Sequence, residues 1–500
     1  MRKKLQELID LLPNAIIQGK KEISEVVIED LAHDSRKVVT GTLFVCLPGA
    51  KTDGHDYIMQ AYRQGAAAIL AEKDIDNIPQ DLTIIKVAST REAMMIVAPY
   101  FFEYPSCKLR MIGITGTNGK TTSTYLIKSI LQQAGFKVGI IGTIQNSIGD
   151  RILPAQNTTP DVIDLQRLLA EMAQADMDYV VMEVSSHALA LNRVAGCEFD
   201  IGIFTNMTRD HLDFHVTFEK YLEAKTKLFQ LLGNGENRKE GKAAIINIDD
   251  KASAFISEHT KCKILTYGIE KHADLLAKDA DIQANGAEFD IIGPFGVMPL
   301  QLKITGLFNV YNVLAAVGAA LAEGIDVHVI KAALENFQSV PGRFELVDAG
   351  QSFSIIVDYA HTPDGLENIL KTAQQIVQKR IIVVFGCGGD RDKTKRPIMG
   401  QLAAQYGDIV IATSDNPRTE DPKTILDEIE IGIKKSLTPG KIYEKIIDRR
   451  HAIERALHLA ETDDIVIIAG KGHENYQILK DRTISFDDKE VAQAIIKEMK

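Results

Sequence analysis

The chain has 500 residues, of which 45% are hydrophobic and 25% charged, with a formal net charge of −11 at pH 7. This length exceeds what a single hydrophobic core supports and predicts two to four globular domains, while the negative charge argues against nucleic acid or an anionic membrane as the main partner. Five widely spaced cysteines without a CxxC pair argue against a disulfide framework or a zinc site. We therefore expect a cytoplasmic protein.

Short apolar runs alternate with helical patterns along the whole chain, which predicts mostly parallel sheets covered by helices, an α/β fold. We expect three domains, covering residues 1–107, 108–340 and 341–500. In the first, the apolar run GTLFVCL precedes an amphipathic helix over about residues 57–64. The uncharged run 304–322 contains two asparagines and two glycines, so it predicts a buried helix and no membrane span.

The second domain begins with a predicted strand, LRMIGIT, that leads into the glycine-rich segment GTNGKTT and a helix. The end of this segment fits the phosphate-loop pattern G-x-x-x-x-G-K-[ST], but the first glycine of the pattern would fall at Ile114. A turn between strand and helix points backbone N–H groups at a phosphate. Lys120 would then reach the terminal phosphates and Thr121 would bind Mg²⁺. Taken alone, the loop is equally compatible with a glycine turn beside a surface lysine.

Two further predicted strands end in residues that suit a nucleotide site. The strand YVVMEV carries Glu183 near its end, and the loop after FDIGIF offers Asp210, His211, Asp213 and His215. Each of these could be a solvated surface group. Because ligands bind at the carboxyl ends of parallel strands, the three loops together favour an ATP–Mg²⁺ site.

The helix TFEKYLEAKTKLFQLL places a lysine on its apolar face. The helical period from Phe218 through Tyr221 and Leu222 reaches Lys225, whereas Lys227 lies off this stripe. Burial would lower the pKa of this amine. Two interpretations stay open: a buried stem with its ammonium in water, or a neutral amine that is modified or takes part in the site.

These residues resemble one family along all three predicted domains. The segments GTNGKTT, EVSSHAL, TNMTRDHLDFH, YLEAKTKLF, GLFNVYN, PGRFE, VDYAHTPD, GCGGDRDKTKRP, SDNPRTEDP and AGKGHE are similar, in this order, to those of the Mur ligases of peptidoglycan synthesis. The resemblance implies a small N-terminal α/β domain that binds a UDP-linked substrate, a central P-loop ATPase-like parallel sheet and a C-terminal Rossmann-like domain that binds an amino acid.

The resemblance also implies the reaction: ATP-dependent amide bond formation that adds meso-2,6-diaminopimelate to UDP-N-acetylmuramoyl-L-alanyl-D-glutamate, through an acyl phosphate. By similarity, Thr121 and Glu183 hold one Mg²⁺ and His211 holds a second, and Lys225 is carbamylated and contributes its carbamate to metal binding. Lys120, Lys225, His211 and Glu183 are the expected catalytic residues. The reaction brings two anionic reactants together, so it needs positive charge around them, and such electrostatic stabilisation is usually the largest contribution to catalysis. We expect a monomer.

The same resemblance assigns three groups of binding residues. For ATP they are Gly116, Thr117, Asn118, Gly119, Lys120, Thr121, Thr122, Asn309, Arg343 and Asp358, with weaker cases for His361 and Lys393. For the UDP substrate they are His33, Ser35, Ala50, Lys51, Thr52, Asn157, Thr158, Thr159, Ser185 and Arg193. For diaminopimelate they are Arg391, Asp415, Asn416, Pro417, Arg418, Gly470 and Glu474. Alternatively, Asn309 is a helix cap, Arg343 a surface turn residue, and Asp415 to Pro417 only a turn.

Arg418 carries the specificity argument. Diaminopimelate has a second carboxylate that lysine lacks, and arginine recognises a carboxylate with two parallel hydrogen bonds. Arg418 in DNPR matches the diaminopimelate-adding pattern, and Glu474 would face the distal ammonium. The competing interpretations are a lysine-adding relative, a ligase similar to folylpolyglutamate synthase, and a P-loop ATPase without ligase activity.

Overall fold

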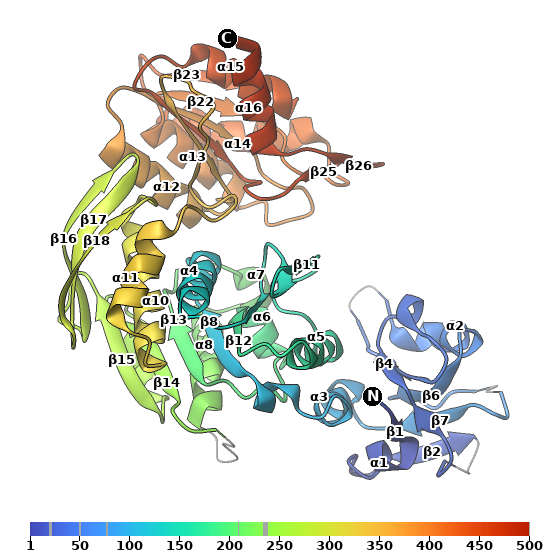
Figure 1. Cartoon of the computed structure of the whole chain (residues 1–500). Helices are drawn as coiled ribbons and strands as arrows, with labels where there is room; N and C mark the ends of the chain where they lie inside the picture. Colours follow the sequence, from blue (N-terminus) through green and yellow to red (C-terminus); the bar gives the residue numbers. More distant parts are fainter. Residues whose placement is uncertain (20–22, 50–51, 77–78, 209, 234–238, 500) are drawn as a thin grey trace.

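The computed structural model describes the chain except residues 20–22, 50–51, 77–78, 209, 234–238 and 500. The described residues form three main sheets, which follow one another along the chain and have five, eleven and six strands. Figure 1 shows these sheets as three bodies: blue for the first, teal to yellow-green for the second, and orange to red for the third. The predicted α/β fold is confirmed.

The first sheet has the strand order β2-β7-β6-β5-β4, and all its neighbours are parallel except β2 and β7. Its strands are β2 (Ile16–Gly19), β4 (Asp30–Ala32), β5 (Thr42–Val45), β6 (Ala66–Ala71) and β7 (Thr83–Lys86). The expected helix is α2 (Ile58–Arg63), and α3 (Thr90–Phe101) follows β7. The short elements β1 (Lys3–Lys4), α1 (Leu5–Ile9) and β3 (Val27–Ile28) precede β4.

The second sheet has the order β11-β10-β9-β12-β8-β13-β14-β15-β16-β17-β18, with parallel pairing from β9 to β16. Its parallel strands are β8 (Arg110–Thr115), β9 (Val138–Ile141), β12 (Tyr179–Glu183), β13 (Ile201–Phe204), β14 (Ala243–Asn247), β15 (Lys263–Gly268) and β16 (Leu275–Gln283). Its antiparallel strands are β10 (Asn146–Ile148), β11 (Arg151–Leu153), β17 (Gly286–Gly293) and β18 (Gly296–Leu302).

Helices cover both faces of the central parallel strands, which explains why β9, β12 and β13 are almost entirely apolar and buried. Ile112 and Ile114 of β8 face the core formed with α4 (Lys120–Gln133), α10 (Leu307–Ala322) and α11 (Val327–Asn336). Met111 faces the opposite core, formed with α5 (Val162–Gln174), α8 (Phe218–Gly233) and α9 (Ser253–Glu258). The uncharged run around residues 304–322 is therefore the buried helix α10, as predicted.

The antiparallel ribbon of β16, β17 and β18 was not predicted. Its first turn contains Asn285-Gly286, a sequence typical of tight hairpins. Alternate residues of β17 and β18, such as Phe289, Ile291, Met298 and Leu300, are buried against the central core. The ribbon extends the sheet to the C-terminal body, where β16 contacts a helix of that body.

The third sheet has the order β19-β20-β24-β21-β22-β23 and is parallel except for β19. Its strands are β19 (Glu345–Leu346), β20 (Ser354–Asp358), β21 (Ile381–Phe385), β22 (Ile409–Ala412), β23 (Ile442–Lys445) and β24 (Ile465–Ala469). One face packs on α12 (Pro363–Ile376), α13 (Lys395–Tyr406) and α14 (Pro422–Ser436), and the other on α15 (Arg449–Leu459) and α16 (Asp488–Met499).

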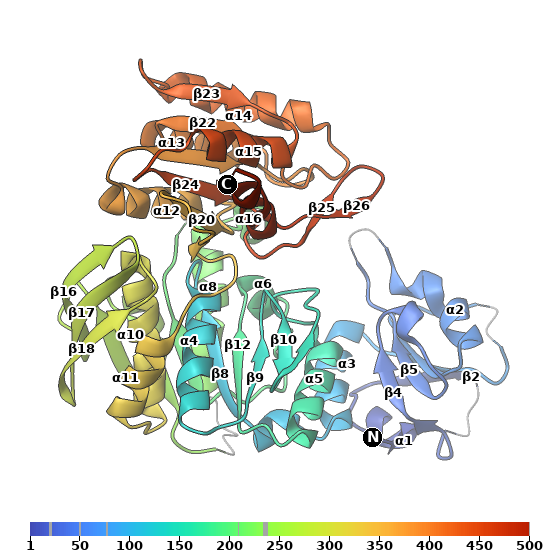
Figure 2. The same cartoon turned by 45° about the horizontal axis from the view of Figure 1, so that its top comes forward.

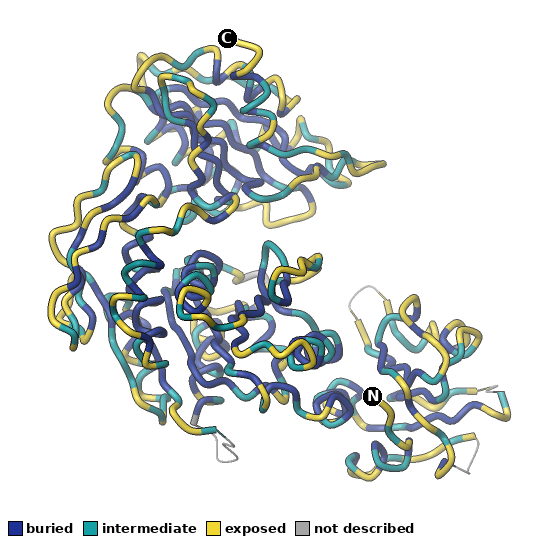
Figure 3. Tube along the Cα trace, viewed as in Figure 1, coloured by how far each residue is buried: buried dark blue, intermediate teal, exposed yellow. Residues whose placement is uncertain are grey.

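Loops at the carboxyl ends of the central and C-terminal sheets meet, because Arg343 and Asp364 contact Thr121 and Asn118. Figure 2 shows the C-terminal body above the central one and the N-terminal body beside α5, and Figure 3 shows that the strands of the sheets are largely buried. The N-terminal body is attached to α5 through Arg167, whose Nη2 donates to Asp30 Oδ1 at 2.8 Å. In the part of the chain that the structure describes, no helix has the length and apolarity needed to cross a membrane.

Candidate active site

The loop between β8 and α4 depends on two glycines. A Cβ at position 116 would collide with Thr205 Oγ1, and one at position 119, where φ is 86°, would collide with Asn312 Oδ1. Ile114, which occupies the place of the missing first glycine, is fully buried in β8. The loop therefore starts two residues later than the pattern requires, yet it still joins a strand to a helix N-terminus, which is the geometry of a phosphate cradle.

Lys120 lies over this loop. Its Nζ donates to the carbonyl oxygens of Gly116 and Thr117 at 2.9 and 2.8 Å. The ammonium is thus held within the loop, which argues against a lysine that only faces solvent. Thr122 is buried in the first turn of α4, and Asn118 turns its side chain toward the C-terminal body.

Glu183, at the end of β12, is a buried carboxylate with neutral partners. Its Oε2 accepts hydrogen bonds from Thr121 Oγ1 and Thr143 Oγ1, both at 3.0 Å, and its Oε1 accepts one from Thr143 N at 2.9 Å. Among the described residues it forms no ion pair. A buried carboxylate without a cation is costly, so this oxygen-rich group beside the phosphate loop fits Mg²⁺.

Thr143 was not identified from the sequence. It follows β9, a strand that lies next to β12, and so obeys the strand-end rule that singled out Glu183. Among the described residues, no three His, Cys, Asp or Glu side chains form a group that could hold a metal ion. A metal here would therefore depend on few protein ligands together with oxygens of the substrates, the usual situation of Mg²⁺.

Lys225 lies on the buried face of α8, as its position in the helical period predicts. Its residue is 1% exposed, and its Nζ lies 4.5 Å from the centre of the Tyr221 ring. Burial lowers the pKa of this amine well below its ordinary value, and the charge of Lys120 lowers it further. The alternative of an ammonium in water is wrong. Phe218, expected on the same buried face, is 40% exposed.

Tyr221 connects Lys225 with two other parts of the site. Its hydroxyl lies 3.0 Å from Thr117 Oγ1 in the phosphate loop. On another side its ring contacts that of His211, with 6.2 Å between the ring centres. His211, a predicted metal ligand, lies 3.3 Å from the carboxylate of Asp210 and packs edge-on against His187.

The other candidates of this loop have different positions. His215 is buried, and its Nε2 lies 2.9 Å from Ser186 Oγ in α6 (Ser186–Ala190). Asp213 belongs to α7 (Leu212–His215), but its side chain lies outside the described part of the structure.

Arg343 links the C-terminal segment to the phosphate loop. Its Nη2 donates to Thr121 Oγ1 at 3.1 Å, and its guanidinium lies 4.8 Å from the centre of the Tyr359 ring. The alternative of a mere surface turn is therefore wrong. Asp358 accepts hydrogen bonds from Phe344 N and Ala360 N, at 2.6 and 2.7 Å, so it fixes the backbone next to Arg343. Burial raises the pKa of this carboxyl.

Asn309 lies in the first turn of α10 and is linked to the phosphate loop by Asn312, whose side chain lies beside Gly119. Its Nδ2 donates to Thr305 O at 2.8 Å, and its Oδ1 accepts from Asn312 Nδ2 at 3.0 Å. The N-cap of α10 is Gly306, so Asn309 does not cap the helix. His361 and Lys393, the weaker candidates, contact Tyr359 O and Glu420.

Asp364, which the sequence did not single out, forms a second link between the two bodies. It lies in the first turn of α12, and its Oδ2 accepts hydrogen bonds from Asn118 Nδ2 at 2.5 Å and from Thr208 Oγ1 at 3.0 Å. Burial raises the pKa of this carboxyl. Together with Arg343, this contact brings the C-terminal body against the phosphate loop.

The central residues assigned to the UDP substrate gather beside Glu183. Thr159 Oγ1 donates to the carbonyl oxygen of Glu183 at 2.9 Å and accepts from Ser185 N at 3.0 Å. Arg193 donates to Thr159 O at 3.3 Å, and Thr158 Oγ1 lies 3.0 Å from Thr143 Oγ1. Asn157 is exposed at the edge of this group.

The N-terminal residues assigned to the same substrate form a separate group after β4. Asp34 caps a short helical turn by accepting from Arg36 N, as the turn signal indicates, and Ser35 Oγ donates to Gln60 Oε1 at 3.3 Å. His33 is partly buried, and Thr52 is exposed. Ala50 and Lys51 lie outside the described residues.

Three loops of the C-terminal sheet meet around the residues assigned to diaminopimelate. Asn416 Nδ2 donates to Glu474 Oε2 at 2.8 Å, and Arg418 Nη1 donates to Gly389 O at 2.9 Å. Asp415 is buried beside Gly470, where a Cβ would approach Asp415 Oδ2 to 2.7 Å. The list is completed by Pro417, which is buried, and by Arg391, which is exposed and donates to Asp390 O.

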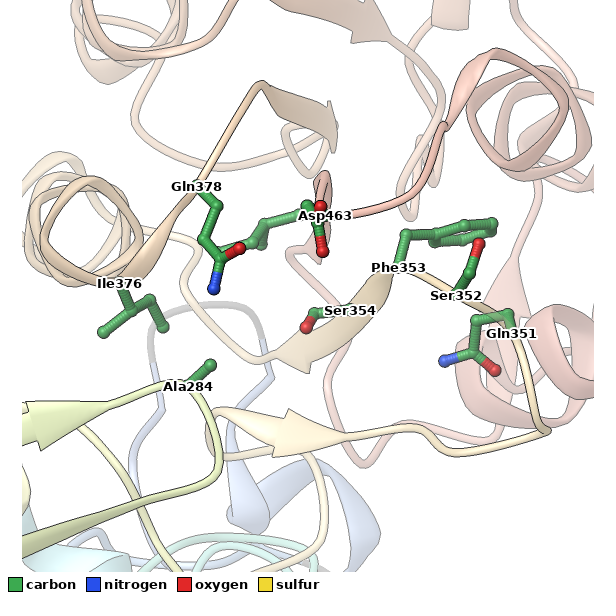
Figure 4. A pocket seen from close by; sticks show the side chains of 9 residues that line it. Ala284, Gln351, Ser352, Phe353, Ser354, Ile376, Gln378 and Asp463 are labelled. Atoms are coloured by element: carbon green, nitrogen blue, oxygen red, sulfur yellow. The ribbon is translucent and has the colours of Figure 1, made fainter.

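A cavity of about 270 Å³ lies away from these loops, between the ribbon and the C-terminal sheet (Figure 4). Ala284 from the β16–β17 turn faces Ser354, Gln378 and Asp463 across it. Ser354 begins β20 and Ile465 begins β24, so the cavity lies at the amino edge of that sheet. It is separate from the candidate site, which is formed at the carboxyl edge.

Comparison with known proteins places three consecutive family domains on the chain. Residues 27–100 match the catalytic domain of the Mur ligase family, residues 114–320 the Mur ligase middle domain, and residues 342–472 the glutamate ligase domain of Mur ligases.

Relatives match the chain over nearly its full length. The UDP-N-acetylmuramoyl-L-alanyl-D-glutamate--2,6-diaminopimelate ligase of Geobacillus thermodenitrificans is 47% identical, over 99% of each chain. The ligase of the same name from Clostridium botulinum is 48% identical, over 97% of each. A solved structure with that name is 33% identical and has a TM-score of 0.68, covering 100% of this chain and 99% of its own.

Proposed function

The chain belongs to the Mur ligase family, and we propose that it joins meso-2,6-diaminopimelate to UDP-N-acetylmuramoyl-L-alanyl-D-glutamate, with conversion of ATP to ADP and phosphate. The observation that carries this proposal is the contact of Arg343 and Asp364 with the phosphate loop. This contact brings the sheet that bears the amino-acid loops next to the phosphate loop. A ligase that uses ATP to couple an amino acid requires these two sites to lie close together.

We assign one substrate to each body. Residues 1–107 bind the UDP group around His33 and Ser35, and residues 108–340 bind ATP on the phosphate loop. Residues 341–500 bind the amino acid between the three loops that contain Arg391, Arg418 and Glu474. The peptide end of the UDP substrate would lie along Thr159, Ser185 and Arg193, beside Glu183.

The first step transfers the terminal phosphoryl group of ATP to the free side-chain carboxylate of the D-glutamyl residue. The turn from Gly116 to Gly119 and the N-terminus of α4 would cradle the phosphates. Lys120 would leave the carbonyl oxygens of the loop for the terminal phosphates and offset their charge. Arg343 reaches the same region from the C-terminal body.

Thr121 and Glu183 would hold Mg²⁺ together with the phosphate groups. When bound, Mg²⁺ would neutralise negative charge on the transferred phosphoryl group. His211 would hold a second Mg²⁺. Lys225 would add to CO₂ through its neutral amine, forming an N–C bond and releasing a proton. The resulting carbamate supplies a negative group beside Tyr221 and the phosphate loop.

In the second step, the amino group of diaminopimelate attacks the acyl phosphate, and the tetrahedral intermediate releases phosphate to give the amide. Arg418 would bind the distal carboxylate, and Glu474 the distal ammonium. Arg418 has guanidinium donors beyond Nη1, which contacts Gly389 O, so it can offer a pair of hydrogen bonds.

The test is phosphate release by the purified protein with each combination of ATP, UDP-linked dipeptide and amino acid. We expect release only when all three substrates are present, with meso-diaminopimelate far better than lysine. Equal turnover with lysine would identify a lysine-adding enzyme, and glutamate-dependent release on a folate would identify a folylpolyglutamate synthase. Release with ATP alone at the full rate would identify an ATPase.

A further inference from the structure

Lys471 is a charged residue inside the C-terminal body that none of the assignments above uses. It follows Gly470 at the end of β24, and its side chain has no exposed surface. A buried ammonium is costly unless it is paired and hydrogen-bonded. Its partners therefore indicate what it does.

The ammonium of Lys471 contacts two of the residues assigned to the amino acid. Its Nζ lies 3.1 Å from Glu474 Oε2 and 3.3 Å from Asn416 Oδ1, and it lies 5.5 Å from the centre of the Tyr476 ring. Because no part of the side chain is exposed, Lys471 cannot bind a substrate directly. It acts on the site through Asn416 and Glu474.

The side-chain amide of Asn416 is held in one orientation by its hydrogen bonds. Its Oδ1 accepts from Lys471 Nζ and from Ile478 N at 2.9 Å, and its Nδ2 donates to Glu474 Oε2 at 2.8 Å. A carbonyl oxygen has two lone pairs, so Oδ1 has none left for a ligand. Asn416 therefore orients Glu474, with one amide N–H to spare.

Glu474 is held through one oxygen only. Its Oε2 has both Lys471 and Asn416 as partners, whereas its Oε1 has no hydrogen bond among the described residues. The side chain of Glu474 is 14% exposed. One carboxylate oxygen is thus fixed from behind while the other stays available to a ligand cation.

We propose that Lys471 is a positioning residue for amino-acid binding: it fixes Glu474 Oε2 and Asn416 Oδ1 so that Glu474 Oε1 receives the distal ammonium of the incoming amino acid. This inference rests on the proposed function, because it concerns the same amino-acid site. It adds a residue that touches no substrate and yet determines the orientation of a group that binds one.

The test uses full-length Lys471→Met, which keeps the length of the apolar stem and removes the charge. We expect the KM for meso-diaminopimelate to rise about tenfold or more, which is the loss expected for a disturbed charged hydrogen bond. The KM values for ATP and for the UDP-linked dipeptide should stay within about twofold of wild type.

Arg380→Met is the matched control for lost stability. Arg380 pairs with the buried Asp464 at 2.6 Å, next to the amino ends of β21 and β24 and so at the edge opposite the site. We expect it to lower the melting temperature without changing the KM for the amino acid. An equal rise of that KM in both variants would overturn the proposal, since it would reduce the effect of Lys471 to stability.

A double variant covers the case in which Lys471→Met alone does not fold. Lys471→Met/Glu474→Gln removes both charges of the pair and avoids a buried carboxylate without its cation. If Lys471 acts through Glu474, the double variant has the same KM for the amino acid as Glu474→Gln. A further rise of about tenfold would show an independent effect and overturn the proposal.

The wild-type protein separates this inference from the proposed function. Without phosphate release that depends on diaminopimelate in wild type, the proposed function fails. With such release and an unchanged KM in Lys471→Met, the proposed function stands and the role of Lys471 is refuted.

Discussion

The substitution Arg418→Ala tests the proposed selection of diaminopimelate over lysine. Arg418 lies in the DNPR turn with a φ of 53°, and its backbone N donates to Ile478 O at 3.2 Å. Its Nη1 donates to Gly389 O at 2.9 Å and to Asn416 O at 3.4 Å. The remaining guanidinium N–H groups are the donors that a carboxylate would use.

The expected loss of kcat/KM follows from the number of hydrogen bonds between Arg418 and the carboxylate. Two parallel hydrogen bonds between a guanidinium and a carboxylate, each worth about 1.5–2 kcal/mol, amount to about 3–4 kcal/mol. This corresponds to a fall of roughly 10²–10³-fold in kcat/KM for meso-diaminopimelate. Alanine shares the backbone preferences of arginine at this left-handed position, so the turn itself acquires no new strain. Lysine lacks the second carboxylate, and its slow turnover should therefore change little.

The assay is phosphate release with each amino acid at saturating ATP and UDP-linked dipeptide. Arg455→Ala, which removes an arginine paired with Glu444 on the surface of the same body, serves as the control and should leave both rates unchanged. If Arg418→Ala lowered the rates with lysine and diaminopimelate by the same factor, the arginine would act on the loop as a whole. Our assignment of the carboxylate would then be refuted.

Two predictions concern the central body. Glu183→Gln keeps an acceptor for Thr143 N, and the hydroxyls of Thr121 and Thr143 can turn to accept from the new amide, so the melting temperature should shift by only a few degrees. The loss of the negative charge should lower kcat about 10²-fold or more. If the variant kept the Mg²⁺ dependence of the wild-type protein, the metal site would be disproved. For Lys225, burial lowers the pKa, so the neutral amine that CO₂ requires exists at a lower pH than for an ordinary lysine. Wild-type activity should fall in CO₂-depleted buffer and return with bicarbonate, whereas Lys225→Ala should be weakly active and indifferent to both; full activity of this variant at ambient CO₂ would exclude a role for the carbamate.

The sequence was informative where chemistry follows from a local rule. Glu183 was identified because parallel strands bring their carboxyl ends together, and Lys225 because a helical period placed it on a buried face. The first rule needs only the succession of strands along the chain, and the second only the residues of one helix. The β16–β18 ribbon was missed although Asn285-Gly286 marks its first turn, since the long helical and apolar runs on either side dominated the pattern.

Residues that hold a site together obey no such rule. Thr143 and Asp364 lie far along the chain from the groups they contact, and Lys471 lies far from Asn416, one of its two partners. Strands β22 and β24 lie on either side of β21 and are parallel to it, so their following loops meet at one edge of the sheet, and Asn416 Oδ1 lies 3.3 Å from the ammonium of Lys471. Asp364 and Lys471 stand within the segments VDYAHTPD and AGKGHE, but only tertiary packing shows which groups they orient. For this reason we expect a variant of the fully buried Lys471 to weaken amino-acid binding, as a variant of Glu474 itself would.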